Sequence, residues 1–188
     1  MKTKTVLSFF SVTLGLAAVA TYATFADADT NAGSSIPIPV PNIAMVAGTE
    51  SSARINVNAL TANLEFLGDK PVLTGHPFLI EFWATWCPPC RASIAHLNDL
   101  NKKYHDRGLQ IVGISDESKT AVERFRAHTP MQYSVALDKH QKLATEFQVE
   151  TIPQAWLFDK DGRLIWSGHP QEIDEQTIAN LLPTHSAT

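Results

Sequence analysis

The chain has 188 residues, of which 44% are hydrophobic and 18% charged, and its formal net charge is −4. These values are ordinary for one globular domain with additional segments. The sequence contains no basic block or basic helical stripe, which argues against nucleic acid as a partner. It has two cysteines, whereas an exported domain stabilised by disulfides would be smaller and richer in cysteine. The two cysteines are therefore free to take part in chemistry.

Residues 1–28 are predicted to be a signal peptide or an uncleaved membrane anchor. Lys2 and Lys4 give a short basic start, and residues 5–26 carry no charge. Ala26-Asp27-Ala28 has the small-x-small pattern expected at a signal-peptidase site. The uncharged run is also long enough to span a bilayer, although its serines and threonines dilute the apolar character. In either case we expect the following domain to work outside the cytoplasm.

Residues 29–53 are predicted to be a Pro- and Ser-rich linker. Pro37, Pro39 and Pro41 stand on alternate positions, which favours extended, polyproline-like segments. A disordered tail without a role of its own fits this composition equally well. The folded domain is expected at residues 54–183, and residues 184–188 are expected to be a tail.

Strands and helices alternate along the predicted domain. We expect strands at residues 78–83, 109–114, 133–137, 155–158 and 164–166, and helices at 87–105, 117–128, 140–147 and 174–182. The run 78–83 is almost continuously apolar, which is typical of a strand that is buried on both faces. Residues 159–162, with the sequence Asp-Lys-Asp-Gly, predict a hairpin turn. This order of elements predicts an α/β fold, a three-layer sandwich with a mixed central sheet.

Cys87 and Cys90 are separated by Pro88 and Pro89, between a predicted buried strand and an amphipathic helix. Two thiols at this spacing on a first helical turn are close enough to form a disulfide. At the helix start, Cys87 would meet unpaired backbone N–H groups and the positive end of the helix dipole, and both favour the nucleophilic thiolate. Proline is tolerated in this turn because its N–H groups have no helical acceptor. The pattern indicates a redox-active pair.

Other uses of a Cys-x-x-C pair are less well supported. A structural zinc site needs about four ligands, and the chain has no third cysteine. A c-type haem attachment needs His after the second cysteine, where this chain has Arg91. A purely structural disulfide remains open, although closing so short a loop adds little stability. We therefore expect no metal and no bound cofactor.

The segment FWATWCPPCR at residues 82–91 resembles the active-site segment of the TlpA/ResA-type thioredoxin-like proteins. Further similarity lies at 108–115, 147–153 and 158–163, in the right order, so the resemblance covers about residues 54–182. It implies a thioredoxin fold and an exported thiol–disulfide reductase, in a group that includes the cytochrome c maturation reductases. The family often has Glu and Pro where this chain has Ser93 and Ala95, which leaves the acid–base arrangement and the maturation partner open.

Glu81 is the one charged residue in the apolar run 78–83, and burying a lone carboxylate is costly. The resemblance implies that this acid lies beneath Cys90 and exchanges its proton with the thiol, because burial raises its pKa. A position on a solvated edge, or a bond to a nearby backbone group, is the alternative. The resemblance also implies a cis bond between Ile152 and Pro153 opposite the cysteines.

The resemblance also implies a surface for substrate. The Ile152 backbone would pair with a substrate chain as a short strand. Trp86 is expected to give the site an exposed apolar rim next to Pro88 and Pro89, so these residues, with Ile152 and Pro153, are the candidate substrate-binding residues.

The predicted function is reduction of protein disulfides outside the cytoplasm, in a bacterial periplasm, with a membrane protein as electron donor. No nucleotide, flavin or metal is implied. Ile80 and Ala84 stand where the peroxidatic Pro-x-x-x-Thr-x-x-Cys pattern needs Pro and Thr, which argues against a peroxidase. Two alternatives remain: the same site acting as a disulfide oxidase or isomerase, and a binding module whose cysteines are incidental.

Overall fold

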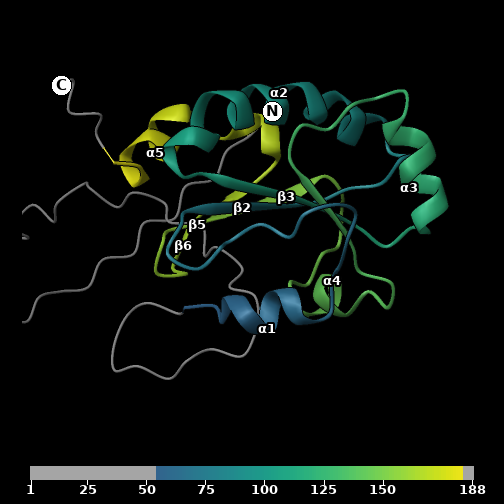
Figure 1. Cartoon of the computed structure of the whole chain (residues 1–188), viewed down its shortest axis with the longest axis horizontal. Helices are drawn as coiled ribbons and strands as arrows, with labels where there is room; N and C mark the ends of the chain where they lie inside the picture. The colour runs from purple at the N-terminus through teal and green to yellow at the C-terminus, as the bar shows by residue number, and fades with distance from the viewer. Residues whose placement is uncertain (1–53, 184–188) are drawn as a thin grey trace, which may run out of the picture. The chain divides into compact units, whose positions relative to one another are not determined.

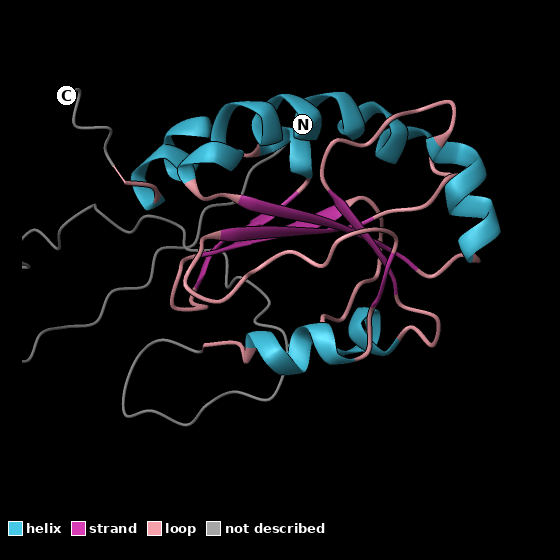
Figure 2. Cartoon of the chain, in the orientation of Figure 1, coloured by secondary structure: helices cyan, strands magenta, loops and turns pink. Residues whose placement is uncertain are grey.

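A six-stranded mixed sheet lies between two layers of helices (Figure 1, Figure 2). The computed structural model describes residues 54–183. The strands follow the spatial order β1-β4-β3-β2-β5-β6; their bounds are β1 Glu65–Phe66, β2 Phe78–Phe82, β3 Gln110–Ser115, β4 Ser134–Leu137, β5 Gln154–Phe158 and β6 Leu164–Gly168. Strands β2, β3 and β4 are parallel, while β1, β5 and β6 each run antiparallel to a neighbour. The predicted three-layer α/β sandwich with a mixed sheet is confirmed.

Helices cover both faces of this sheet. Figure 1 shows α2 (Pro88–Tyr104), α3 (Lys119–Arg126) and α5 (Glu175–Leu181) on one side, and α1 (Val57–Ala62) and α4 (Lys142–Glu146) on the other. Two short 3₁₀ turns, His105–Arg107 and Pro170–Glu172, complete the described elements. We refer to the first side as the α2 face.

Strand β2 is buried along its whole length and contributes to two apolar clusters. Leu79 belongs to the cluster on the α2 face, together with Trp83 just beyond the strand, whereas Ile80 and Phe82 belong to the opposite cluster. This separation follows from the alternation of side chains along a strand. It also places the Glu81 side chain on the α2 face.

Helix α2 begins directly after the loop that leaves β2. Cys87 is its N-cap residue, and Pro88 and Pro89 occupy the first turn, where their missing N–H groups leave no hydrogen bond unmade. After the 3₁₀ turn the chain reverses at Gly108, whose φ of 108° is a left-handed conformation that glycine adopts at little cost. The helix therefore starts and stops where the sequence predicted.

Two predicted helices are shorter than expected at their N-terminal ends. Helix α3 begins at Lys119 because the Ser118 hydroxyl accepts the Ala121 N–H at 3.3 Å. Helix α4 begins at Lys142, where the buried Asp138 carboxylate accepts the backbone N–H of Lys142 and Ala144. Residues 117–118 and 140–141, which were predicted to be helical, instead belong to the connections that precede the two helices.

Other expectations concern the turn and the ends of the chain. The turn at 159–162 connects β5 and β6, with Asp159 accepting the N–H groups of Asp161 and Arg163. Helix α1 and strand β1 were not predicted, because six and two residues are too short for a clear periodic pattern. The candidate signal peptide, linker and tail lie outside the described residues. Within residues 54–183, no helix is long and apolar enough to cross a membrane.

Candidate active site

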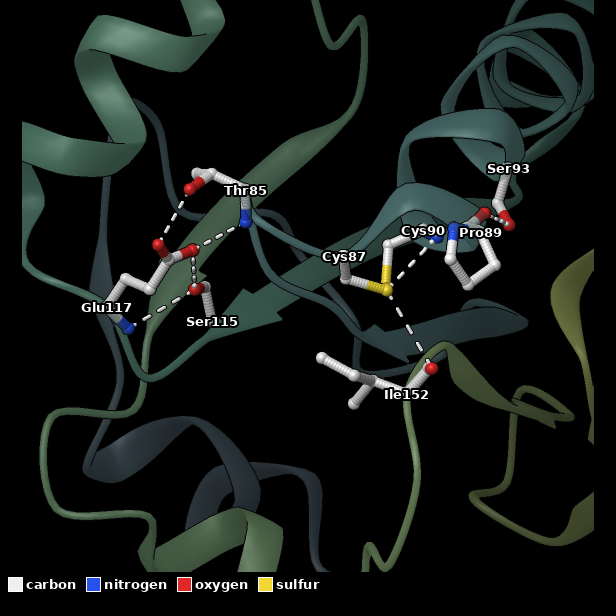
Figure 3. The surroundings of a disulfide bond; sticks show 8 residues. All are labelled: Thr85, Cys87, Pro89, Cys90, Ser93, Ser115, Glu117 and Ile152. Carbon is white, nitrogen blue, oxygen red and sulfur yellow. Dashed lines mark hydrogen bonds between the residues drawn. A yellow bond between two sulfur atoms is a disulfide. The ribbon is translucent and has the colours of Figure 1, made fainter.

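Cys87 and Cys90 form a disulfide at the start of α2, with an S–S distance of 2.06 Å (Figure 3). The Cys90 N–H donates to Cys87 Sγ at 3.2 Å, so the sulfur itself caps the helix. In the reduced pair, the same N–H group and the helix dipole would stabilise a Cys87 thiolate. Cys87 is 3% exposed and Cys90 is fully buried, so Cys87 is the sulfur nearer to solvent. The geometry thus suits Cys87 as nucleophile and Cys90 as resolving thiol.

Exposed apolar groups surround this disulfide. Trp86 is 68% exposed, and Pro88 and Pro89 are also exposed. The Ile152–Pro153 peptide bond is cis, and the Ile152 carbonyl oxygen lies 3.8 Å from Cys87 Sγ. Figure 3 shows the Ile152 carbonyl oxygen facing the Cys87 sulfur. The fold therefore brings all the candidate substrate-binding residues of the sequence to the disulfide.

Glu81 is fully buried, which excludes the alternative of a solvated sheet edge. Neither of its carboxyl oxygens has a hydrogen-bond partner among the described residues, so the alternative of a backbone bond is excluded as well. Burial raises the pKa of Glu81 from about 4.5 to about 8, and the neighbouring Tyr133 hydroxyl offsets only part of this rise. At neutral pH the group is therefore mostly protonated and can release or accept a proton close to that pH.

The same apolar layer contains Glu81 and both cysteines. Glu81 lies between Leu79 and Trp83 on the α2 face, and the cluster that these two residues join also includes Cys87 and Cys90. A carboxyl group in the same layer as two thiols could serve as their proton acceptor if it is ionised, or as their proton donor if it is not. The burial of Glu81 is compatible with the role that the resemblance implied, and proton exchange with Cys90 stays a prediction.

A second carboxylate, which the sequence analysis did not identify, holds the loop before the cysteines. Glu117 follows β3 and accepts the Thr85 N–H at 2.6 Å and the Thr85 hydroxyl at 2.7 Å (Figure 3). The Ser115 hydroxyl donates to the same carboxylate at 3.2 Å. Parallel strands β2 and β3 end at the same sheet edge, which was the available signal that Glu117 would lie beside the loop. The interaction fixes the chain two residues before Cys87.

Ser93 lies on the buried side of α2, where relatives often have Glu. Its hydroxyl donates to the Pro89 carbonyl at 3.1 Å, within the first turns of the helix. The side chain is therefore satisfied locally and adds no second carboxyl group here. Ala95, at the position of the family proline, is exposed.

A match to a protein-family model shows the family of the chain. The model of the AhpC/TSA family matches residues 69–167, which is more than half of the chain and includes strands β2 to β5 and most of β6. The chain belongs to the AhpC/TSA family. This family assignment and the fold described above confirm the thioredoxin-like α/β class that the resemblance implied.

The chain is also similar to named thiol-disulfide oxidoreductases. The chain is 36% identical over 110 residues to the thiol-disulfide oxidoreductases ResA of Bacillus thuringiensis (strain Al Hakam) and Bacillus anthracis. The match covers 58% of this chain and 61% of each relative, so the chain spans about three fifths of the length of these relatives.

Solved structures similar to this chain include two from Chlorobium tepidum. One is provisionally named thiol:disulfide interchange protein DsbE, with 30% identity and a TM-score of 0.54 over 58% of this chain and 82% of that one. The other is a thiol:disulfide interchange protein of the thioredoxin family, with 25% identity, a TM-score of 0.51 and the same coverage. The two cysteines therefore lie in a fold that related proteins share.

Replacing Glu81 by Gln tests the buried, protonated carboxyl group. The folded protein keeps the proton up to about pH 8, whereas the unfolded chain releases it near pH 4.5. The wild type therefore loses stability as the pH rises through this window, and Glu81→Gln does not. We expect the variant to gain up to about 5 kcal/mol relative to the wild type between pH 4.5 and 8. Chemical denaturation of the oxidised proteins across this range measures the difference; parallel curves for the two proteins would contradict the prediction.

Replacing Glu117 by Ala tests the anchor of the active-site loop. The change leaves the Thr85 N–H and hydroxyl without their acceptor, so we expect a loss of about 1–3 kcal/mol in the free energy of unfolding. Glu117→Gln, which retains one acceptor oxygen, should lose less. Glu123→Ala is the matched control, because this exposed side chain makes only a surface ion pair with Lys119 and should change stability by about 0.5 kcal/mol or less. Equal losses for Glu117→Ala and the control would show that the anchor is unimportant.

Proposed function

We propose that this protein is an exported thiol–disulfide oxidoreductase that reduces disulfide bonds of extracytoplasmic proteins. The observation that carries the proposal is the Cys87–Cys90 pair at the start of α2, with the buried Glu81 carboxyl group on the same face of the sheet. Membership of the AhpC/TSA family and the similarity to proteins named thiol-disulfide oxidoreductase support it.

The proposed reaction begins with the reduced protein. The Cys87 thiolate attacks one sulfur of the substrate disulfide, which forms a mixed disulfide and releases the other substrate sulfur as a thiolate. Cys90 then loses its proton to ionised Glu81 and attacks Cys87 Sγ. The bond between Cys87 and the substrate breaks, the second substrate sulfur leaves with the electron pair and takes up a proton, and the protein holds the Cys87–Cys90 disulfide. Two electrons have passed from the protein to the substrate, without a bound cofactor.

Substrate binding is proposed at the exposed groups around Cys87. Trp86 and Ile152 also line a cavity of about 180 Å³, whose other lining includes the apolar side chains of Phe82, Ile114 and Val149. An extended substrate chain could pair with the Ile152 backbone and insert an apolar side chain next to its reacting cysteine. Pro88, Pro89 and Pro153 complete this surface.

The location and the electron donor are further parts of the proposal. The pattern of residues 1–28 supports export, either as a cleaved signal peptide or as an anchor, and a bacterial periplasm is the compartment that best fits the resemblance. Each catalytic turn leaves the protein oxidised, so a donor must reduce it again; we propose a membrane-bound protein that exchanges thiols with Cys87. Ile80 and Ala84, in place of the peroxidatic Pro and Thr, argue against peroxidase activity within this family.

Single cysteine substitutions test the order of events. Cys90→Ser should trap the mixed disulfide, because Cys87 can still attack and nothing resolves the product. Cys87→Ser should form no adduct and lose activity altogether. Mass spectrometry after incubation with a disulfide-containing peptide distinguishes the variants. A binding module with incidental cysteines would keep its function in a variant that lacks both, and that result would contradict the proposal.

The reduction potential of the domain tests the direction of exchange. Equilibration with glutathione buffers, followed by separation of the oxidised and reduced forms, gives this value. We expect a potential near that of thioredoxin, about −270 mV, as befits a reductase. A potential near −120 mV, the value for DsbA, would instead identify an oxidase that uses the same site.

A further inference from the structure

The α2 face of the sheet contains a group of buried polar atoms without hydrogen-bond partners among the described residues. They are both carboxyl oxygens of Glu81, Nε1 of Trp83 and the hydroxyl oxygen of Tyr133. Buried polar atoms almost always have partners, and each exception calls for a reason. Here the group combines one acid with two hydrogen-bond donors, and the proposed reaction has used only the acid.

Gly113 brings these side chains together. In the β2–β3 pairing, Gly113 lies directly beside Glu81. A Cβ atom on Gly113 would stand 3.0 Å from Trp83 Nε1 and 3.1 Å from a ring carbon of Tyr133, closer than such contacts normally are. The indole and the phenol ring therefore occupy the space that a side chain on β3 would fill, next to Glu81. Any larger residue in place of Gly113 would push them away.

We propose that Tyr133 is a positioning residue for the proton exchange between Glu81 and Cys90, because its hydroxyl donates a hydrogen bond to the Glu81 carboxylate when that group is ionised. This inference rests on the proposed function. The Tyr133 ring lies against Gly113, the residue that pairs with Glu81, and its buried hydroxyl has no hydrogen-bond partner among residues 54–183. Burial, and then the charge of Glu81, raise the pKa of Tyr133 well above 10, so the phenol remains a donor at every pH at which the exchange runs.

Of the two unpartnered donors, Trp83 Nε1 and the Tyr133 hydroxyl, it is Tyr133 that lowers the pKa of Glu81. Strand β5 presents Ala155 beside Glu81, and β3 presents Gly113, so neither strand adds a titratable side chain. Helix α2 contributes the two cysteines to this layer. Arg126, at the end of α3, acts on the pKa of Tyr133 and donates to the Leu67 carbonyl at 3.1 Å.

The Tyr133 hydroxyl affects one step of the proposed reaction, the transfer of the Cys90 proton to Glu81. Glu81 must be ionised to take the proton from Cys90, and the hydrogen bond from Tyr133 increases the ionised fraction at a given pH. Tyr133 keeps its own proton throughout, so the step needs no additional reactant. Without the hydroxyl, less Glu81 is ionised near neutral pH, and Cys90 resolves the mixed disulfide more slowly.

Tyr133→Phe removes only the hydroxyl and tests this role. NMR titration of the Glu81 carboxyl carbon in the oxidised protein should give a midpoint about one pH unit higher than in the wild type. The rate of mixed-disulfide resolution, measured in a single turnover, should have its inflection shifted by the same amount and be about tenfold lower at pH 7. A loss of packing alone would lower stability and leave the midpoint where it was.

Tyr104→Phe is the matched control. Tyr104 is buried in the same apolar cluster, but its hydroxyl donates to Glu175 at 2.8 Å, so this variant should leave the Glu81 midpoint unchanged. In a Glu81→Gln background the inflection should be absent, and adding Tyr133→Phe should not alter the pH profile further. Gly113→Ala provides a second variant: by displacing the Tyr133 ring, it should also raise the Glu81 midpoint.

An unchanged Glu81 midpoint in Tyr133→Phe, or an equal shift in Tyr104→Phe, would overturn the inference. The carboxyl titration needs no substrate and no catalytic activity. If the wild type failed to exchange disulfides at all, the proposed function would fail, while the titration would still decide whether Tyr133 sets the ionisation of Glu81. The two proposals can therefore fail separately.

Discussion

The carboxyl group of Glu81 is carried by the central strand into a layer that is otherwise almost entirely apolar. Ionising it there is costly, so the group keeps its proton until about pH 8, close to the ordinary pKa of a thiol. Two groups with similar pKa values exchange a proton at little cost in free energy, which is the condition that a resolving cysteine needs. The rest of the layer accommodates this carboxyl group: Gly113 leaves space beside it, and Tyr133 and Trp83 fill that space with donors.

The surroundings of Cys87, the proposed nucleophile, are set by other residues of the same sheet and helix. Cys87 lies where the chain leaves β2 and α2 begins, and the N–H of Cys90 points at its sulfur. Glu117, at the end of the neighbouring parallel strand, holds the loop through Thr85. Segments distant in the sequence thus meet at one edge of the sheet, because parallel strands end there together and the cis Ile152–Pro153 loop faces them. Related proteins share this fold, and in this chain the Ser93 hydroxyl is satisfied within the first turns of α2 by the Pro89 carbonyl.

Some features followed from the residues alone. The apolar run at 78–83, the Cys-x-x-C pair before an amphipathic helix and the Asp159 turn each depend on local chemistry, so they specify a buried strand, a reactive helix start and a hairpin without knowledge of the fold. Glu81 stood out because a single charge in an apolar run must find an environment that tolerates it. The starts of α3 at Lys119 and of α4 at Lys142 were missed because hydrogen bonds to the Ser118 and Asp138 side chains compete locally with one more helical turn, and the sequence pattern does not show which arrangement prevails.

Only the tertiary structure decided which residues surround the cysteine pair and the Glu81 carboxyl group. Glu117 and Tyr133 lie 36 and 52 residues after Glu81 in the chain, and they reach the site only because β3 and β4 pair in parallel beside β2 in a particular register. The same pairing sets Gly113 against Glu81 and so determines the space available to the phenol ring. The sequence by itself determined the chemistry of the cysteine pair, because thiol reactivity at a helix start is a local property. The surroundings that set the pKa of Glu81 depend on the pairing of strands distant in the sequence, because burial and non-bonded neighbours are properties of the assembled sheet.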